Sequence, residues 1–205
     1  MSNEKQVDSG RRGLLVATCA AGGVVGVSTA GVLVSTLQPS ERAKAAGAPV
    51  EVDISDVKPG ELKVAEWRGK PVWILRRTPE MLASLKQNDA LVADPDSDKS
   101  FQLDVPKYAK NEFRAYEKHK DLLVVVGICS HLGCSPSARF QEGAQPNLPD
   151  DWHGGFLCPC HGSTFDLSGR VFKNKPAPVN LDVPPYMYLS DNKILIGKDE
   201  EKGEA

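Results

Sequence analysis

The hydrophobic pattern begins with one long apolar run near the N-terminus. Residues 13–37 contain no charged side chain over 25 positions. As a helix rising ~1.5 Å per residue, this run would extend about 37 Å, which exceeds the roughly 30 Å hydrocarbon core of a bilayer. The apolar region of a secretory signal is shorter, about 7–15 residues. The pattern therefore favours a retained transmembrane helix over a cleaved signal, for which the A-x-A-like stretch at 46–48 would supply the site.

The pattern changes after this run. A polar segment with prolines near both ends, residues 38–49, predicts a flexible linker. Beyond it, Val50, Val52 and Ile54 alternate with acidic residues, as in a strand with one buried face. Further strands are expected at 72–75, 122–128, 169–172, 187–189 and 194–196, the last two joined by a turn at 191–192. Residues 50–205 are therefore interpreted as one all-β domain of packed antiparallel sheets.

Helical signals in this domain are few. Thr78, Pro79 and Glu80 form a capping hydroxyl, a proline at the first helical position and an acid in the first turn, which predicts a short helix. A second short helix is expected over 108–116. The acidic tail from Asp199 is expected to be a solvated end.

Composition adds constraints on function and topology. The net charge of −2 argues against a nucleic-acid partner, and 18 glycines with 15 prolines suit a turn-rich β protein. Arg11 and Arg12 directly precede the apolar run and look like a twin-arginine export signal, although an ordinary positive-inside flank would have the same sequence. On both interpretations residues 1–12 stay in the cytoplasm and the domain at 50–205 is exported.

Four of the five cysteines fall in two short boxes, Cys129 to Cys134 (C-S-H-L-G-C) and Cys158 to Ser163 (C-P-C-H-G-S). Each box supplies a cysteine–histidine pair and has one further cysteine. Two thiolates and two imidazoles could hold zinc, but a structural zinc site leaves no cysteine over. One iron held by two cysteines and one by two histidines is the Rieske arrangement of a [2Fe–2S] centre. The fifth cysteine, Cys19, is interpreted as a small apolar residue of the membrane helix.

Together with the anchor and the linker, the two boxes resemble those of the Rieske iron–sulfur protein of the cytochrome bc complex. The resemblance implies an all-β Rieske domain in which the cluster-binding loops form a small subdomain. It implies that Cys129 and Cys158 hold the inner iron of one [2Fe–2S] cluster, and that His131 and His161 hold the outer iron. It also implies a disulfide between Cys134 and Cys160.

Further roles are implied by the same resemblance. Leu132 would shield the cluster and line the quinol contact, His161 would meet the quinol, and Ser163 would donate its hydroxyl to a bridging sulfide. Residues 175–178 resemble the family's proline loop, which covers the cluster. Family members often have a tyrosine two residues after that serine, and Phe165 stands there instead.

His119 and His153 lack ligand spacing and are interpreted as surface residues. The resemblance implies a catalytic subunit of the respiratory quinol–cytochrome c reductase, which passes electrons from quinol to a c-type cytochrome beside a cytochrome b subunit. It would be a single-pass protein of the bacterial inner membrane with its C-terminal domain in the periplasm. Two alternatives are a relay subunit of a periplasmic oxidoreductase such as arsenite oxidase, and a soluble ferredoxin-type Rieske module.

Overall fold

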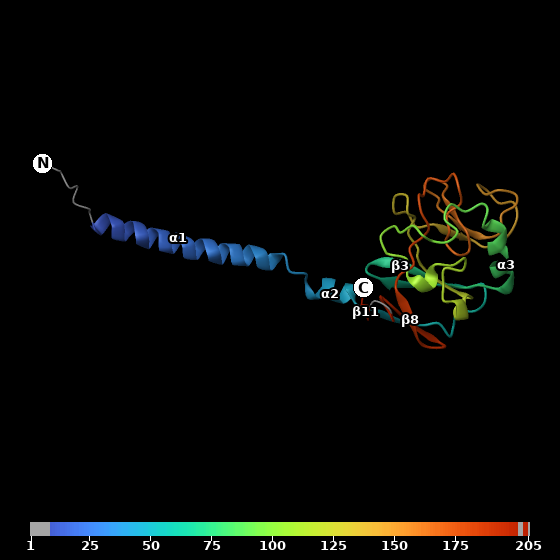
Figure 1. Cartoon of the computed structure of the whole chain (residues 1–205), viewed down its shortest axis with the longest axis horizontal. Helices are drawn as coiled ribbons and strands as arrows, with labels where there is room; N and C mark the ends of the chain where they lie inside the picture. Colours follow the sequence, from blue (N-terminus) through green and yellow to red (C-terminus); the bar gives the residue numbers. More distant parts are fainter. Residues whose placement is uncertain (1–8, 201–202, 205) are drawn as a thin grey trace. The chain divides into compact units, whose positions relative to one another are not determined.

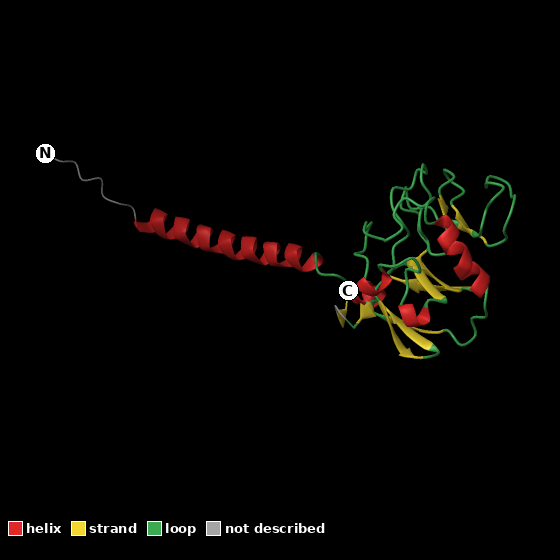
Figure 2. Cartoon of the chain, turned by 45° about the vertical axis from the view of Figure 1, so that its right-hand side comes forward, coloured by secondary structure: helices red, strands yellow, loops and turns green. Residues whose placement is uncertain are grey.

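The computed structural model describes residues 9–200 and 203–204. The chain forms two compact units, with the boundary between Ala45 and Ala46 (Figure 1). The N-terminal unit is helical, and the C-terminal unit contains the strands (Figure 2). Each unit is described by itself below.

The first unit contains α1 (Ser9–Thr36), a helix of 28 residues without a buried side chain. Its length and apolar composition fit a single membrane span, and at ~1.5 Å per residue it extends about 42 Å. The hydroxyls of Thr18 and Thr29 donate to the carbonyls four residues earlier at 2.8 Å, so these polar groups are satisfied within the helix. The helix begins four residues before the predicted start and takes in Arg11 and Arg12. Residues 1–8 of the predicted cytoplasmic segment lie outside the described residues.

The predicted linker at 38–49 contains a short helix, α2 (Glu41–Gly47). The hydroxyl of Ser40 accepts a hydrogen bond from Ala43 N–H at 3.2 Å, as an N-cap does, and Lys44 pairs with Glu41 at 2.8 Å. The Gly and Ala content favours flexibility, but a capped, alanine-rich turn is also a good helix former. The segment predicted as a flexible linker therefore includes one short, capped helix.

The C-terminal unit is built from small antiparallel sheets. One has the order β1 (Val50–Asp53), β9 (Lys193–Ile196), β8 (Tyr186–Ser190). The second has the order β2 (Leu62–Trp67), β3 (Lys70–Arg76), β4 (Leu122–Val126). The third has the order β5 (Ser137–Arg139), β6 (Gly155–Leu157), β7 (Thr164–Phe165). A two-stranded ladder pairs β10 (Lys198–Asp199) with β11 (Gly203–Glu204).

The described part of this unit also contains three short helical elements. They are α3 (Pro79–Asn88) and the 3-10 turns η1 (Lys107–Ala109) and η2 (Glu117–His119).

One hydrophobic core joins these sheets. All five residues of β4 are buried, as the apolar run at 122–128 predicts. The chain leaves β4 over the indole of Trp73, where a Cβ on Gly127 would lie 2.2 Å from a ring atom. Only glycine allows the backbone to pass this close to the indole. The chain then continues to Cys129. The core thus fixes the starting point of the first cysteine–histidine box.

Several predicted elements are confirmed. The helix α3 begins with Thr78 as its N-cap, whose hydroxyl accepts from Met81 N–H at 3.3 Å. The strands β1, β3 and β4 occupy the predicted segments, and β8 and β9 form the hairpin around 191–192.

Other expectations are corrected by the structure. The helix expected over 108–116 is limited to the 3-10 turn η1 at its start, because the Asn111 side chain holds the following loop through hydrogen bonds with Tyr108, Phe113 and Ala115. Residues 169–172 make only isolated bridges. The expectation of a solvated tail is wrong for its first residue, since Asp199 is buried in β10, and residues 201–202 and 205 lie outside the described residues.

Candidate metal centre

The first cysteine–histidine loop directly follows β4. Cys129 N–H donates to the Cys134 carbonyl at 2.7 Å, and Gly133 N–H donates back to the Cys129 carbonyl at 3.1 Å. Gly133 has a φ of +81°, a backbone conformation that glycine adopts without strain. These bonds close residues 129–134 into a compact loop.

The second loop repeats this geometry after β6. Cys158 N–H donates to the Ser163 carbonyl at 2.7 Å, and Gly162 N–H donates to the Cys158 carbonyl at 3.0 Å. Gly162 has a φ of +73°. The near symmetry of the two boxes in sequence therefore corresponds to two loops with the same hydrogen-bond pattern.

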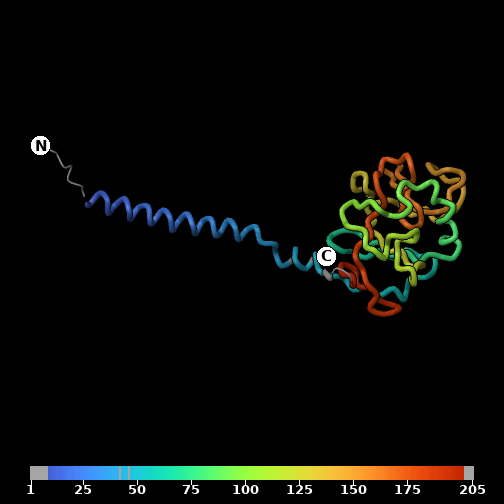
Figure 3. Tube along the Cα trace, in the orientation of Figure 1, coloured from blue at the N-terminus to red at the C-terminus, as the bar shows by residue number. Residues whose placement is uncertain are grey.

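A third segment is tied to both loops by serine side chains. Ser130 donates its hydroxyl to the Val179 carbonyl at 2.6 Å, and Ser163 Oγ accepts from Ala177 N–H at 3.0 Å. This segment, residues 177–179, overlaps the proline loop predicted at 175–178. Both loops and this segment belong to the yellow-to-orange part of the trace, on the side of the domain away from the red β8–β9 hairpin (Figure 3). The role of Ser130 was not predicted, because its partner is 49 residues away in the sequence.

A disulfide joins the two loops. Cys134 and Cys160 are bonded, with a separation of 26 residues in sequence and their Cα atoms 6.7 Å apart. This is the pairing that the resemblance implies. The Cys158 sulfur lies within 4.8 Å of both disulfide sulfurs, so the disulfide is adjacent to a proposed ligand.

The two remaining cysteines of the loops are free thiols in the interior. Cys129 is 0% and Cys158 is 2% exposed. Burial raises the pKa of the Cys129 thiol, and the neighbouring Cys158 adds to this rise, while hydrogen bonds from His131 N–H and the Ser163 side chain oppose it. Two adjacent buried thiolates repel each other unless a cation neutralises them.

The two histidines of the loops lie together on the outer side. The ring centroids of His131 and His161 are 4.7 Å apart, and the planes are nearly perpendicular at 87°. His131 is half-buried and His161 is exposed. Leu132, beside His131, is 71% exposed, which is unusual for a leucine in a loop held this firmly.

This donor set fits a [2Fe–2S] cluster. The disulfide removes two of the four box cysteines, which leaves two buried thiols and two outward imidazoles on paired loops. A two-iron cluster with cysteines on one iron and histidines on the other needs two thiolates and two imidazoles, and the paired loops offer both pairs. The two adjacent buried thiols, with hydrogen-bond donors that favour the thiolate form of Cys129, supply an independent reason for a cation there.

Buried charged side chains stabilise the turn that follows the second loop and β7. The Asp166 carboxylate, next to β7, pairs with Arg170 Nε at 2.8 Å and accepts the N–H groups of Ser168 and Arg170. Arg77 and Arg114, also buried, donate to carbonyls of the 167–169 turn. Burial lowers the pKa of each of these two guanidinium groups to about 10. This support was not predicted, because lone arginines far apart in sequence do not indicate a shared site.

The two other histidines lie away from the paired loops. His119 is half-buried and stacks on Tyr188 at 4.2 Å between ring centroids, and His153 lines a separate cavity. Both are therefore less exposed than the surface residues that were predicted.

Comparison with known proteins gives consistent matches. The family model described as Rieske [2Fe-2S] domain matches residues 49–186. The ubiquinol-cytochrome c reductase iron-sulfur subunit of Allochromatium vinosum is 52% identical over 194 residues, covering 94% of this chain and 91% of that protein. The subunit of the same description from Bradyrhizobium diazoefficiens is 42% identical over 185 residues, covering 90% and 92%. A chain of the solved hyperthermophilic respiratory Complex III is 27% identical with a TM-score of 0.43, covering 87% of this chain and 97% of that one.

Proposed function

The chain belongs to the Rieske [2Fe–2S] family, with the iron–sulfur subunits of ubiquinol–cytochrome c reductase, and on this basis we propose that it transfers electrons from quinol to a c-type cytochrome. The ligands we propose are Cys129 and Cys158 for the inner iron, with His131 and His161 for the outer iron. A bound [2Fe–2S] cluster supplies one-electron redox chemistry at this site. The partners would be cytochrome b and c-type cytochrome subunits.

The observation that carries this proposal is the exposed edge of the site. The two imidazoles and Leu132 reach the surface together, whereas the two free thiols of the loops, Cys129 and Cys158, are buried. A quinol can therefore approach the His161 ring but not the cysteines. With one ring nitrogen of His161 bound to iron, the other would be free to accept the quinol proton. Leu132 would cover the quinol ring and exclude water from this contact.

The membrane arrangement is part of the same proposal. The helix α1 would be a single-pass anchor in the bacterial inner membrane, with residues 1–12 in the cytoplasm and the domain in the periplasm. The placement of Arg11 and Arg12 at its N-terminal end supports this orientation and export as a folded protein. Residues 38–49 would act as the hinge between the anchor and the domain.

Leu132→Glu is the experiment that tests the quinol contact. The side chain is exposed and holds no metal, so the variant should assemble with its spectrum unchanged. Placing a carboxylate against the quinol ring should lower quinol–cytochrome c turnover by about tenfold or more. The assay compares turnover per cluster in the purified complex, with the cluster quantified by electron paramagnetic resonance.

Leu189→Glu is the matched control, since Leu189 is an exposed leucine of β8 outside the paired loops. Its turnover should equal that of the parent. If Leu132→Glu also keeps full turnover, the exposed edge is not a quinol site, and a relay role like that of arsenite oxidase subunits becomes the better proposal.

Phe165→Tyr tests whether a hydroxyl at this position, where family members often have tyrosine, would donate a hydrogen bond to a ligand cysteine sulfur. Phe165 is fully buried and pairs with Phe156 of the strand that leads to Cys158. A hydroxyl that donates to a ligand sulfur stabilises the reduced centre, and a net hydrogen bond of about 0.5–1.5 kcal/mol corresponds to a rise of about 20–65 mV. Redox titration of the full chain measures this shift. Phe113→Tyr, in a loop without ligands, should change the potential by only a few millivolts; the same small change in Phe165→Tyr would show that Phe165 only packs.

A further inference from the structure

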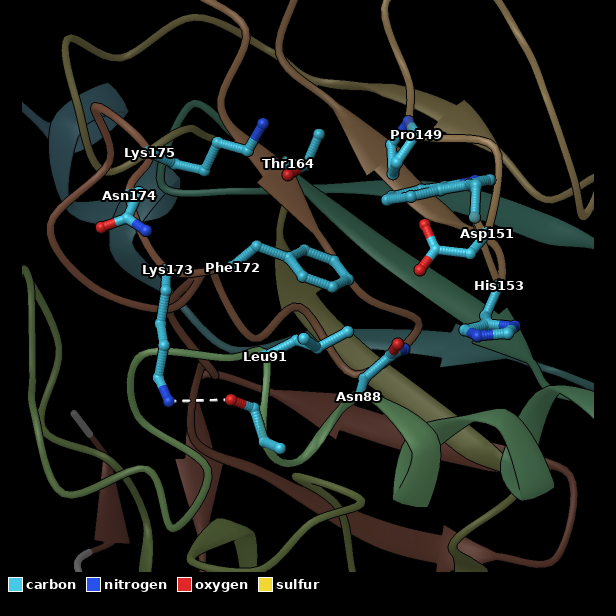
Figure 4. Close-up of a pocket in the computed structure, with 12 residues that line it drawn as sticks. Asn88, Leu91, Pro149, Asp151, His153, Thr164, Phe172, Lys173, Asn174 and Lys175 are labelled. Atoms are coloured by element: carbon cyan, nitrogen blue, oxygen red, sulfur yellow. Dashed lines mark hydrogen bonds between the residues drawn. The ribbon is translucent and has the colours of Figure 1, made fainter.

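A cavity of about 360 Å³ lies apart from the metal loops. It is formed where the end of α3 meets the 149–153 segment, β7 and residues 172–175 (Figure 4). None of its lining residues belongs to the loops 129–134 and 158–163. Its volume is within the range of pockets that hold small organic ligands, which is about 300–1,000 Å³.

Apolar side chains form most of the cavity wall. Trp152 is buried, and its indole N–H donates to the Arg139 carbonyl at 2.9 Å, which fixes the position of the ring. The Phe172 ring lies with its centroid 5.6 Å from that of Trp152, at an angle of 41°. Figure 4 shows the side chain of Leu91 below the Phe172 ring. An aromatic ligand would therefore enter a preformed apolar space.

One end of the cavity has a free hydroxyl group. Thr164, the first residue of β7, is only 2% exposed, and its hydroxyl makes no hydrogen bond within the described part of the chain. Neighbouring atoms do not cover this hydroxyl completely, so a ligand in the cavity can reach it. Figure 4 shows the Thr164 hydroxyl on the same side of the Phe172 ring as the Lys175 ammonium.

Lys175 brings an uncompensated charge to the same end. It is half-buried, and its ammonium has no hydrogen-bond or ion-pair partner among residues 9–200 and 203–204. The neighbouring Lys173 differs, because its ammonium donates to the Ala90 carbonyl at 2.8 Å. Partial burial of a charge without a partner costs free energy, so an anion beside Lys175 would be favoured. A carboxylate fits best, since it can accept from the ammonium and from the Thr164 hydroxyl together.

We propose that this cavity is a binding site for a small aromatic carboxylate. The carboxylate would accept from Lys175 and Thr164, and the ring would lie against Trp152 and Phe172. The Asp151 carboxylate, which also lines the cavity, lies near the other end of the Phe172 ring in Figure 4. Its repulsion would keep the ligand's carboxylate at the Lys175 end. The site is independent of the electron transfer proposed above.

Benzoate is the probe that tests this site, with acetate and benzylamine as comparison ligands. Calorimetric titration of the full, cluster-loaded chain in detergent, with a detergent blank, should show saturable benzoate binding with a dissociation constant on the order of 1 mM. Acetate lacks the ring, and benzylamine has the ring with the opposite charge, so each should bind about tenfold more weakly or worse. Binding of either one as tight as that of benzoate, or no saturable benzoate binding, would overturn the proposal.

Two substitutions locate the binding in the cavity. Lys175→Met removes the charge and keeps an unbranched side chain, and it should weaken benzoate binding about tenfold. Thr164→Val removes the hydroxyl with little change in shape and should weaken binding about fivefold. Lys118→Met, at an exposed lysine of η2, is the control and should bind benzoate as the parent does.

Parental benzoate affinity in folded Lys175→Met and Thr164→Val would place the binding elsewhere and overturn the proposal. The two variants change different segments of the chain, so either one tests the site if the other fails to fold. The preference of the parent for benzoate over acetate and benzylamine tests it without any substitution.

Discussion

Replacing His161 with alanine in the full chain should abolish the electron paramagnetic resonance signal of a mixed histidine–cysteine [2Fe–2S] centre. The reason is the ligand count: the disulfide occupies Cys134 and Cys160, so the paired loops have no spare thiol or imidazole to substitute for a lost ligand. His131→Ala should have the same effect. Spectra at low temperature and assays of iron and acid-labile sulfide on the purified protein measure the loss.

His119→Ala is the matched control for this experiment. His119 stacks on Tyr188 and lies outside both loops, so the signal and the iron content should match the parent. Parent protein that contains one zinc ion and no acid-labile sulfide would contradict the ligand assignment. A retained signal in His161→Ala would remove His161 from the ligand set.

The double variant Cys134→Ser with Cys160→Ser should destabilise the domain strongly. A cross-link over 26 residues of separation stabilises by about 3–4 kcal/mol on the chain-entropy model. The full decrease in the free energy of unfolding should appear in the chain without its cluster. A cluster held by Cys129 and Cys158 would itself tie the same two loops, so the loaded chain should lose less stability than the cluster-free chain. The loaded variant should nevertheless lose its cluster faster on heating.

Urea unfolding followed by tryptophan fluorescence measures this difference, because all three tryptophans, Trp67, Trp73 and Trp152, lie in the C-terminal unit. Cys19→Ser, in α1, is the control and should unfold at the parental urea concentration. Equal unfolding midpoints for the double variant and the parent would contradict the prediction. Mass spectrometry that finds both thiols free in oxidised protein would contradict the disulfide itself.

Local sequence signals predicted those parts of the fold that depend on neighbouring residues. The Thr78 cap, the apolar run before Cys129 and the turn at 191–192 each act within a few positions, and the structure has an element at each place. The strand β2 was missed because its burial does not alternate cleanly: Val64 is 58% exposed, while Lys63 is half-buried and reaches Asp56. This segment is a strand because it pairs with β3 along its whole length.

The metal site shows the same contrast between local signals and long-range contacts. The two boxes revealed their cysteines and histidines because the residue types are close together in sequence. The bonds that fix the loops connect distant segments: Ser130 to Val179, and Arg170 to Asp89 across 81 positions.

The two serine bonds to the 177–179 segment have a consequence for electron transfer. Ser130 and Ser163 tie each loop to the same stretch of chain, and the disulfide joins the loops to each other. Donor atoms held from several sides shift little when a neighbouring charge changes, so little energy is spent on rearranging the surroundings. A small reorganisation energy lowers the activation barrier for electron exchange in both directions. The site would therefore accept and release electrons rapidly even with a weak driving force.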